Sequence, residues 1–239
     1  MQITASMKNK SMKSKHLIVA LSYALSLTSA VLHGADTVTP DLKAIPSGKG
    51  WSLTPGFKAE VVDLNGKAAV RIIASDRKGL DGALARLEGV TFESGEIEVD
   101  ILAPQGTRSA FVGIAFRIQD EKQMDLVYFR PQKFGEPKKK GDLVGEVQYS
   151  SEPKYGWSRL RNKFPLKYEK RLPKAPENQA AWFHARIVVE GAKVRVYVDG
   201  ATEPCLTVEE SLSGRTQGGV GLWTWSGGAF ANLKITPRN

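Results

Sequence analysis

The sequence predicts an all-β fold, a two-sheet antiparallel β-sandwich, from three observations. Residues 182–235 read as five short β-type pieces separated by Gly, Asp and Pro, which is typical of an antiparallel meander. Residues 57–74 hold two β-rich runs joined by Asn65-Gly66, a dipeptide that favours a type I′ hairpin turn. Residues 95–101, GEIEVDI, alternate strictly between apolar and acidic side chains. No segment shows a convincing helical pattern.

Two further segments extend this pattern toward the middle of the chain. Residues 82–92 are predicted to form a strand. The runs at 110–120 and 124–131 are predicted to pair across a polar turn, which would place Tyr128 and Arg130 on one face. The neighbouring strand would carry Arg117.

The first part of the chain, residues 1–35, is predicted to be a signal peptide. Four lysines between positions 8 and 15 precede a mostly apolar run at 17–32. A spanning helix needs about 20 predominantly apolar residues, and this run is shorter and contains Ser and Thr, so no stable membrane span is predicted. The expectation is export to the periplasm or the extracellular space, with cleavage after Ala30 or after Ala35.

The mature chain is predicted to be a short arm followed by one domain. Residues 36–50 are polar, with two Pro and two Gly, and read as a flexible N-terminal arm. The sandwich is expected at 51–237. Long connections at 131–176, rich in Pro, Lys, Arg and aromatic residues, interrupt it and indicate a binding surface or a lid.

Cysteine, histidine and cofactor patterns give few candidates. The single Cys205 cannot form an internal disulfide and reads as a small buried hydrophobe. His184 has no companion His, and no Cys pair or calcium-loop motif occurs, so neither a metal site nor a cofactor is predicted.

The positive charge is concentrated in the long loops. Residues 129–174 contain thirteen Lys or Arg against five acidic residues. Tyr155, Trp157 and Arg161 in this stretch could stack on sugar rings and bind carboxylate or sulfate groups. The alternative is that the rings pack the loops onto the sandwich while the charges keep them soluble. Nucleic acid is not the expected partner, because the chain is predicted to be exported.

Glu96, Glu98 and Asp100 are the candidate catalytic residues. Alternate residues on one strand lie about 6–7 Å apart, and paired carboxylates act as acid and base on glycosidic bonds. An outward strand face is also commonly charged only because it is solvated, so this alternative stays open.

The chain resembles the concanavalin A-like lectin/glucanase superfamily and, within it, the secreted domain family named for 3-keto-disaccharide hydrolases. The resemblance covers about residues 51–235 and rests on FVGIAFRIQD with MDLVYFRP, VQYSSEPKYGW, AWFHARIVVEGAKVRVYVDG and GGVGLWTWSGGAFANLKI. It implies a jelly roll that meets carbohydrate on its concave face. The family-16 glucanase signature, E-x-D-x-x-E or E-x-D-x-E, is absent. The residues that the resemblance puts near the concave face are Arg117, Tyr128, Arg130, Gln148, Trp157 and Trp223.

Two functions follow as hypotheses. In the first, the domain processes a saccharide, hydrolysing a glycosidic bond with carboxylates as acid and base, while Arg117 and Arg130 orient the sugar. In the second, it is a non-catalytic binding or adhesion module for an acidic glycan or a cell-surface polymer. The oligomeric state stays open.

Overall fold

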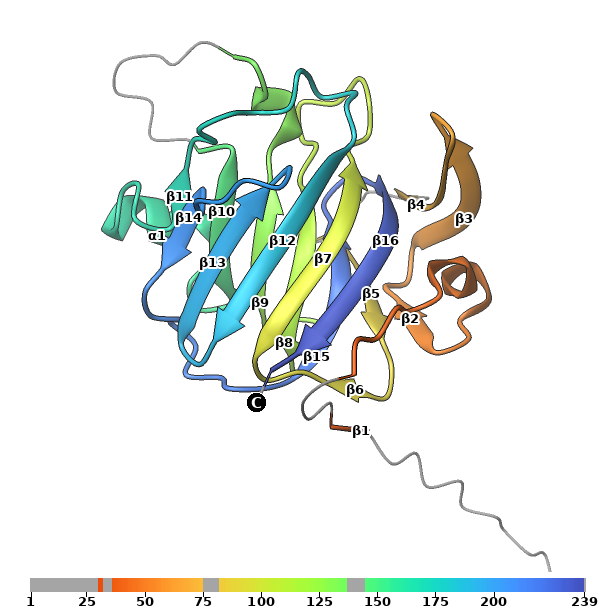
Figure 1. The fold of residues 1–239 in the computed structure, drawn as a ribbon, viewed down its shortest axis with the longest axis horizontal. Coiled ribbons are helices and arrows are strands. Elements are labelled where there is room, and N and C mark those ends of the chain that lie inside the picture. Colours follow the sequence, from red (N-terminus) through yellow and green to blue (C-terminus); the bar gives the residue numbers. More distant parts are fainter. Residues whose placement is uncertain (1–29, 32–35, 75–81, 137–144, 239) are drawn as a thin grey trace, which may run out of the picture.

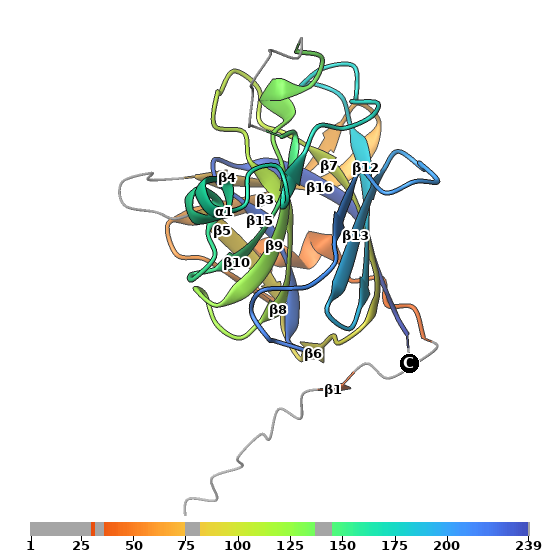
Figure 2. The same ribbon diagram turned by 90° about the vertical axis from the view of Figure 1, so that its left-hand side faces the viewer.

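The computed structural model describes residues 30–31, 36–74, 82–136 and 145–238. Two seven-stranded antiparallel sheets lie face to face in it (Figures 1 and 2), which confirms the predicted β-sandwich. Among the described residues, no helix has the length and apolarity needed to cross a membrane.

The first sheet, sheet I, lies on the left in Figure 2, with the helix α1 on its outer side. Its strands, in spatial order, are β11 (Glu169–Lys170), β10 (Val147–Glu152), β9 (Met124–Phe129), β8 (Val112–Ile118), β15 (Gly219–Thr224), β5 (Ala83–Leu87) and β2 (Trp51–Leu53).

The second sheet, sheet II, faces the viewer in Figure 1. Its strands, in spatial order, are β14 (Leu206–Val208), β13 (Lys193–Val198), β12 (Phe183–Glu190), β7 (Gly95–Leu102), β16 (Gly228–Pro237), β4 (Lys67–Ala74) and β3 (Phe57–Leu64). The remaining elements are β1 (Ala30–Val31), which pairs with β6 (Val90–Thr91), the 3-10 helices η1 (Leu42–Ser47) and η2 (Pro131–Lys133), and α1 (Trp157–Lys163).

The core fills the space between the two sheets. Ile97, Val99 and Ile101 of β7 are fully buried in it, as their alternation predicts. The hairpin prediction is also confirmed, because Asn65 and Gly66 both have positive φ and join β3 to β4. The predicted pairing of β8 with β9 is found as well.

The C-terminal third is not a single meander. β12, β13 and β14 pair in chain order, but β15 lies in sheet I between β8 and β5, and β16 returns to sheet II between β7 and β4. The prediction of neighbouring strands was wrong here because period-2 alternation fixes which face of a strand is buried but not which strand lies beside it.

Two loop predictions are also corrected. In place of a flexible arm, residues 36–50 contain η1, whose Leu42 and Ile45 are buried in the core, and Val38 pairs with Ile235. The basic loops contain α1, a helix that the sequence analysis did not predict. Its seven residues are too few for a helical repeat to be visible in the sequence.

Candidate functional site

The outer face of sheet I, on the side away from the core, holds a cavity of about 670 Å³. Apolar side chains form a separate cluster there, although the outer face of a sandwich is usually polar. Five aromatic residues line the cavity: Phe111, Tyr128, Trp157, Trp223 and Trp225.

Strand register brings two of these rings together on the floor. Trp223 of β15 and Tyr128 of β9 both pair with Gly113 of β8, which lies between them. A Cβ on Gly113 would lie only 2.1 Å from the carbonyl oxygen of Val127, so the position has no room for a side chain. The two ring centroids are therefore only 5.4 Å apart. The pair forms a tilted aromatic floor over bare backbone.

A buried polar network holds the edge of this floor. Arg130 donates to the Gly145 carbonyl at 2.8 Å and also to the Tyr128 hydroxyl, Gln148 and Glu169. Glu169 in turn accepts two hydrogen bonds from Arg161, at 2.8 and 2.9 Å. One buried carboxylate thus fixes two arginines at the cavity, and Arg161 binds it in the paired geometry that guanidinium and carboxylate groups favour.

Tyr128 is a neutral hydrogen-bonding group in this network. Burial raises the pKa of its phenol to about 12. Its hydroxyl donates to Gln148 Oε1 at 2.9 Å and accepts from Arg130. The ring therefore stays uncharged at physiological pH and presents an apolar face to the cavity.

The rim of the cavity is open to solvent. Trp157, the first residue of α1, is 53% exposed, and the Arg161 guanidinium lies 5.1 Å from its ring centroid. Trp225, after the end of β15, is 37% exposed. Exposed aromatic faces around an apolar floor suit a flat ligand that carries both C–H and hydroxyl groups.

The structure brings five of the predicted binding residues to this cavity. They are Tyr128, Arg130, Trp157, Arg161 and Trp223. Gln148 lies behind them, fully buried, as a partner of Tyr128 and Arg130. Tyr155 lies outside the lining, with Lys154 and Arg159 beside its ring.

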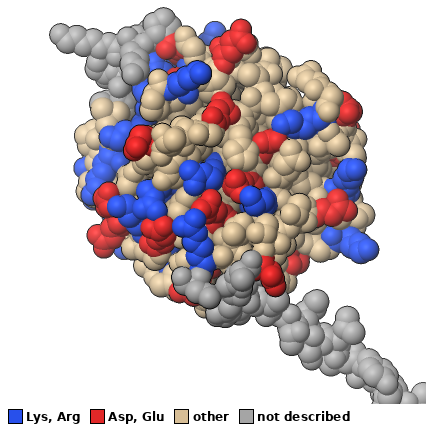
Figure 3. Space-filling view, in the orientation of Figure 1, with Lys and Arg blue, Asp and Glu red and all other residues tan. Residues whose placement is uncertain are grey.

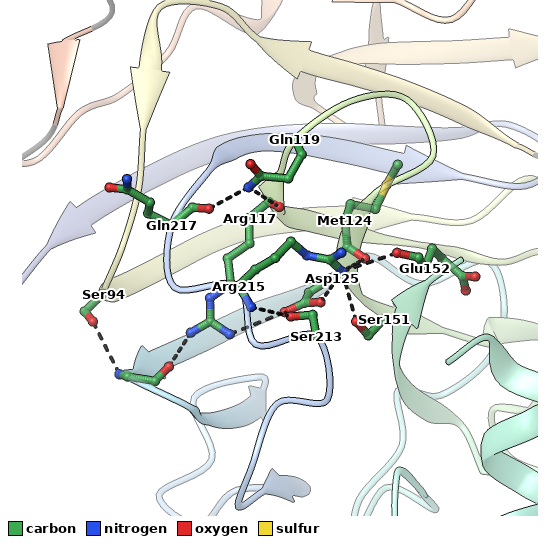
Figure 4. A network of polar contacts seen from close by, with 11 residues as sticks. Ser94, Arg117, Gln119, Met124, Asp125, Ser151, Glu152, Ser213, Arg215 and Gln217 are labelled. Atoms are coloured by element: carbon green, nitrogen blue, oxygen red, sulfur yellow. Dashed lines mark hydrogen bonds and ion pairs between the residues drawn. The ribbon is translucent and has the colours of Figure 1, made fainter. Parts of the chain in front are cut away.

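The placement of Arg117 is corrected. Arg117 has a φ of 50° and is skipped where β8 pairs with β15, which makes a β-bulge. The bulge turns its side chain from the outer face into the sandwich, where it is fully buried and donates to Asp125 at 3.3 Å and to the Gly191 carbonyl (Figure 4). Arg117 is therefore a structural residue. Its placement was wrongly predicted because the simple alternation of side chains fails across a bulge.

The acidic residues Glu96, Glu98 and Asp100 lie on the outer face of sheet II, and none of them lines the cavity. Figure 3 shows that face, where acidic and basic side chains alternate. Glu98 pairs with Lys234 at 2.5 Å and Asp100 with Lys67 at 2.6 Å. This arrangement supports the solvated-face alternative.

Asp100 makes the stability of the fold depend on pH. Burial alone would raise the pKa of Asp100, but hydrogen bonds from Lys67, His184 and Asn232 outweigh it and hold the pKa below its ordinary value of 3.8. A group whose pKa is lower in the folded state stabilises the fold above its unfolded pKa, and this stabilisation is lost as the pH falls through the folded pKa.

We therefore expect Asp100→Asn to lower the free energy of unfolding at pH 7 by about 1–2 kcal/mol, because the partly exposed Lys67 and His184 lose a buried charged partner. The difference from the wild type should shrink as the pH falls below the unfolded pKa. Urea unfolding at pH 7 and at pH values below 4 measures it. Glu203→Gln, at an exposed position, should change stability little at either pH. If Asp100→Asn lost as much free energy of unfolding at low pH as at pH 7, this account would be contradicted.

Several lining residues were missed by the sequence analysis. Met124, Leu126 and Tyr128 alternate on the outer face of β9, while Val127 and Phe129 face the core. A strand that is apolar on both faces in an antiparallel sandwich was the available signal, because one face must then meet something other than water. Other lining residues that were not among the predicted site residues are Phe111, Glu121, Lys122, Gln132, Lys133, Glu152, Pro153 and Trp225.

Metal and thiol chemistry have no site in the described part of the chain. No group of three or more His, Cys, Asp or Glu residues there could hold a metal ion. Cys205 is buried, and burial raises the pKa of its thiol to about 12. The thiol is therefore not a reactive thiolate at physiological pH.

Solved structures with the same fold are found at low sequence identity. Carbohydrate-binding module CBM66 from Bacillus subtilis has a TM-score of 0.50 and 17% identity, covering 78% of this chain and 96% of the module. A protein of unknown function with a galectin-like fold, also from Bacillus subtilis, has a TM-score of 0.53 and 11% identity, covering 83% of this chain and 94% of that one. A native glycosidic hydrolase has a TM-score of 0.50 and 12% identity, covering 88% of this chain and 99% of the hydrolase chain.

The similarity to these three structures supports the fold of this chain. At these identities it extends no further than the β-sandwich architecture that the three structures share with this chain. No protein-family model matches the sequence, and no curated protein does.

Proposed function

We propose that this chain binds carbohydrate in the cavity over sheet I. The observation that carries the proposal is the aromatic floor of Tyr128 and Trp223 together with the exposed rings of Trp157 and Trp225. Aromatic faces pack against the C–H faces of sugar rings, and nearby polar groups bind their hydroxyls. The shared fold with a carbohydrate-binding module is compatible with this function.

The charges around the cavity favour a neutral sugar over an acidic one. Lys122 and Lys133 line it together with Glu121 and Glu152. The two lining arginines share the buried carboxylate of Glu169. A nearly balanced set of donors and acceptors suits hydroxyl groups, which both donate and accept.

A glycan array tests the proposal. Wild-type protein should bind neutral oligosaccharides, and binding should change little between 50 mM and 500 mM salt. A steep loss of binding with salt would instead indicate the acidic glycan or polymer of the alternative hypothesis. Binding to no saccharide on the array would contradict the proposal.

Hydrolysis of a glycosidic bond, including that of a 3-keto-glycoside, is the second candidate function. Its support is that two carboxylates, Glu121 and Glu152, line the same cavity, as acid–base cleavage requires. The test is a product assay on each array ligand with the wild type, Glu121→Gln and Glu152→Gln. If the wild type cleaves a ligand and both Glu121→Gln and Glu152→Gln abolish the cleavage, hydrolysis is established. Tight binding without any product would instead support a non-catalytic binding module.

We also propose that the chain is exported, with residues 1–35 as its signal peptide. The structure describes only Ala30 and Val31 of this segment. N-terminal sequencing of protein recovered from the periplasm or medium should begin after Ala30 or after Ala35. A product in the cytosol that starts at Met1 would contradict it.

A further inference from the structure

A second, smaller cavity of about 240 Å³ adjoins the first on the outer face of sheet I. Glu121 lines both cavities. Leu84 of the second cavity pairs across β5 and β15 with Trp223 of the first. The two hollows are therefore neighbouring parts of one sheet face.

The second cavity is built around Arg86, which has no partner among the described residues. Its Nε is buried without a hydrogen bond, and its guanidinium makes no ion pair there. Arg117 and Arg215 also have a buried Nε without a hydrogen bond, but their guanidiniums, like that of Arg130, bind a carboxylate. Without a carboxylate partner, the terminal N–H groups of Arg86 can donate to a ligand in the cavity that accepts.

The backbone beneath Arg86 gives its side chain a fixed place. A Cβ on Gly219 would lie 3.1 Å from Arg86 Nε, so the arginine lies against the strand where this position has no side chain. The second cavity thus holds a donor that is positioned by the sheet and not by an ion pair.

The groups around Arg86 indicate what the ligand is. Asp120 and Glu121 add two carboxylates to the one arginine of the second cavity. Asp120 accepts from two backbone N–H groups of its own turn, whereas Glu121 lies exposed in the turn. A uronate or sulfate would be repelled by these carboxylates. Ring hydroxyls can accept from Arg86 and donate to Glu121, so a neutral sugar ring fits.

Strand pairing gives the distance between the two cavities. Arg86 pairs with Gly221, Gly221 with Ala115, and Ala115 with Leu126, which lines the first cavity. Three strand spacings separate Arg86 from Leu126, roughly 14 Å. This span exceeds one sugar ring, so a ligand that occupies both cavities needs more than one ring, and Glu121 lines both ends of its path.

We propose that Arg86 forms a second subsite for a neutral sugar ring, so that the ligand of this protein is an oligosaccharide chain that crosses sheet I from the aromatic cavity. The inference rests on the proposed carbohydrate binding. It adds a prediction about chain length that carbohydrate binding alone does not make.

The experiment measures affinity against chain length by isothermal titration. The probes are oligosaccharides of two to six rings in the β-1,4-glucan, β-1,3-glucan, β-1,4-xylan and β-1,4-mannan series. In at least one series the wild type should bind the longest member about tenfold or more tightly than the disaccharide. Arg86→Gln should remove this gain and leave the affinity for the disaccharide within about twofold.

The control is Arg71→Gln, which removes the same charge from the outer face of sheet II. It should keep the full dependence on chain length. Equal affinity for all lengths in the wild type, or an unchanged gain in Arg86→Gln, would overturn the second subsite while carbohydrate binding stands. Binding to no member of any series would overturn the second subsite, and binding to no saccharide on the glycan array either would overturn both proposals.

Discussion

Asp125→Ala should destabilise the protein more than any other single substitution considered, by about 3–5 kcal/mol in the free energy of unfolding. Asp125 is fully buried and accepts from Arg117 at 3.3 Å, Arg215 at 2.8 Å and Ser213 at 3.3 Å (Figure 4). Removing it leaves the buried Arg117 charge without a carboxylate. Urea unfolding followed by tryptophan fluorescence gives the value.

The control for this prediction is an exposed ion pair. Glu60→Ala breaks the pair with Arg71, in which both side chains are more than 40% exposed, and should cost less than about 1 kcal/mol. The double variant Arg117→Met/Asp125→Ala should recover part of the loss, because the uncompensated charge is gone. A loss below about 1 kcal/mol in Asp125→Ala, or no recovery in the double variant, would contradict a structural role for this network.

Trp157→Ala should weaken the binding of an array ligand about thirtyfold, equivalent to about 2 kcal/mol. Trp157 is 53% exposed and lines the cavity, so its ring contributes contact area to a ligand and little to the core. The free energy of unfolding should therefore change by less than about 0.5 kcal/mol. Titration calorimetry with the tightest oligosaccharide measures the loss.

Phe164→Ala is the matched control for Trp157. Phe164 follows α1, is 36% exposed and does not line the cavity. The variant should bind as the wild type does. Equal losses in the two variants would mean that the exposed rings act on the stability or solubility of the loops and not on the ligand.

The sandwich and several strand pairs could be predicted because alternation and turn chemistry are local. Asn65-Gly66 fixed one hairpin, and the alternation of 95–101 fixed the buried face of β7. The exchange of β15 into sheet I could not be predicted, because strand neighbours depend on contacts far apart in the sequence. The packing of η1 against the core depends on such contacts as well.

The candidate site was predictable in some of its aromatic and basic residues but not in its geometry. Tyr128, Arg130 and Trp223 were expected together, and they line one cavity. Arg117 was misplaced because nothing in its own sequence indicates the bulge that turns it inward. Glu96 and its acidic neighbours on β7 were predicted to be catalytic from their alternating spacing. Spacing along a strand does not tell which sheet face holds a cavity, and these residues do not line it.

The most direct test of carbohydrate binding over sheet I is a crystal structure of the protein with the tightest neutral oligosaccharide from the array. The account predicts a sugar ring packed against Trp223 and Tyr128, beside Trp157, with further rings extending past Glu121 toward Arg86. Electron density for the saccharide on the outer face of sheet II, or away from this cavity altogether, would contradict it.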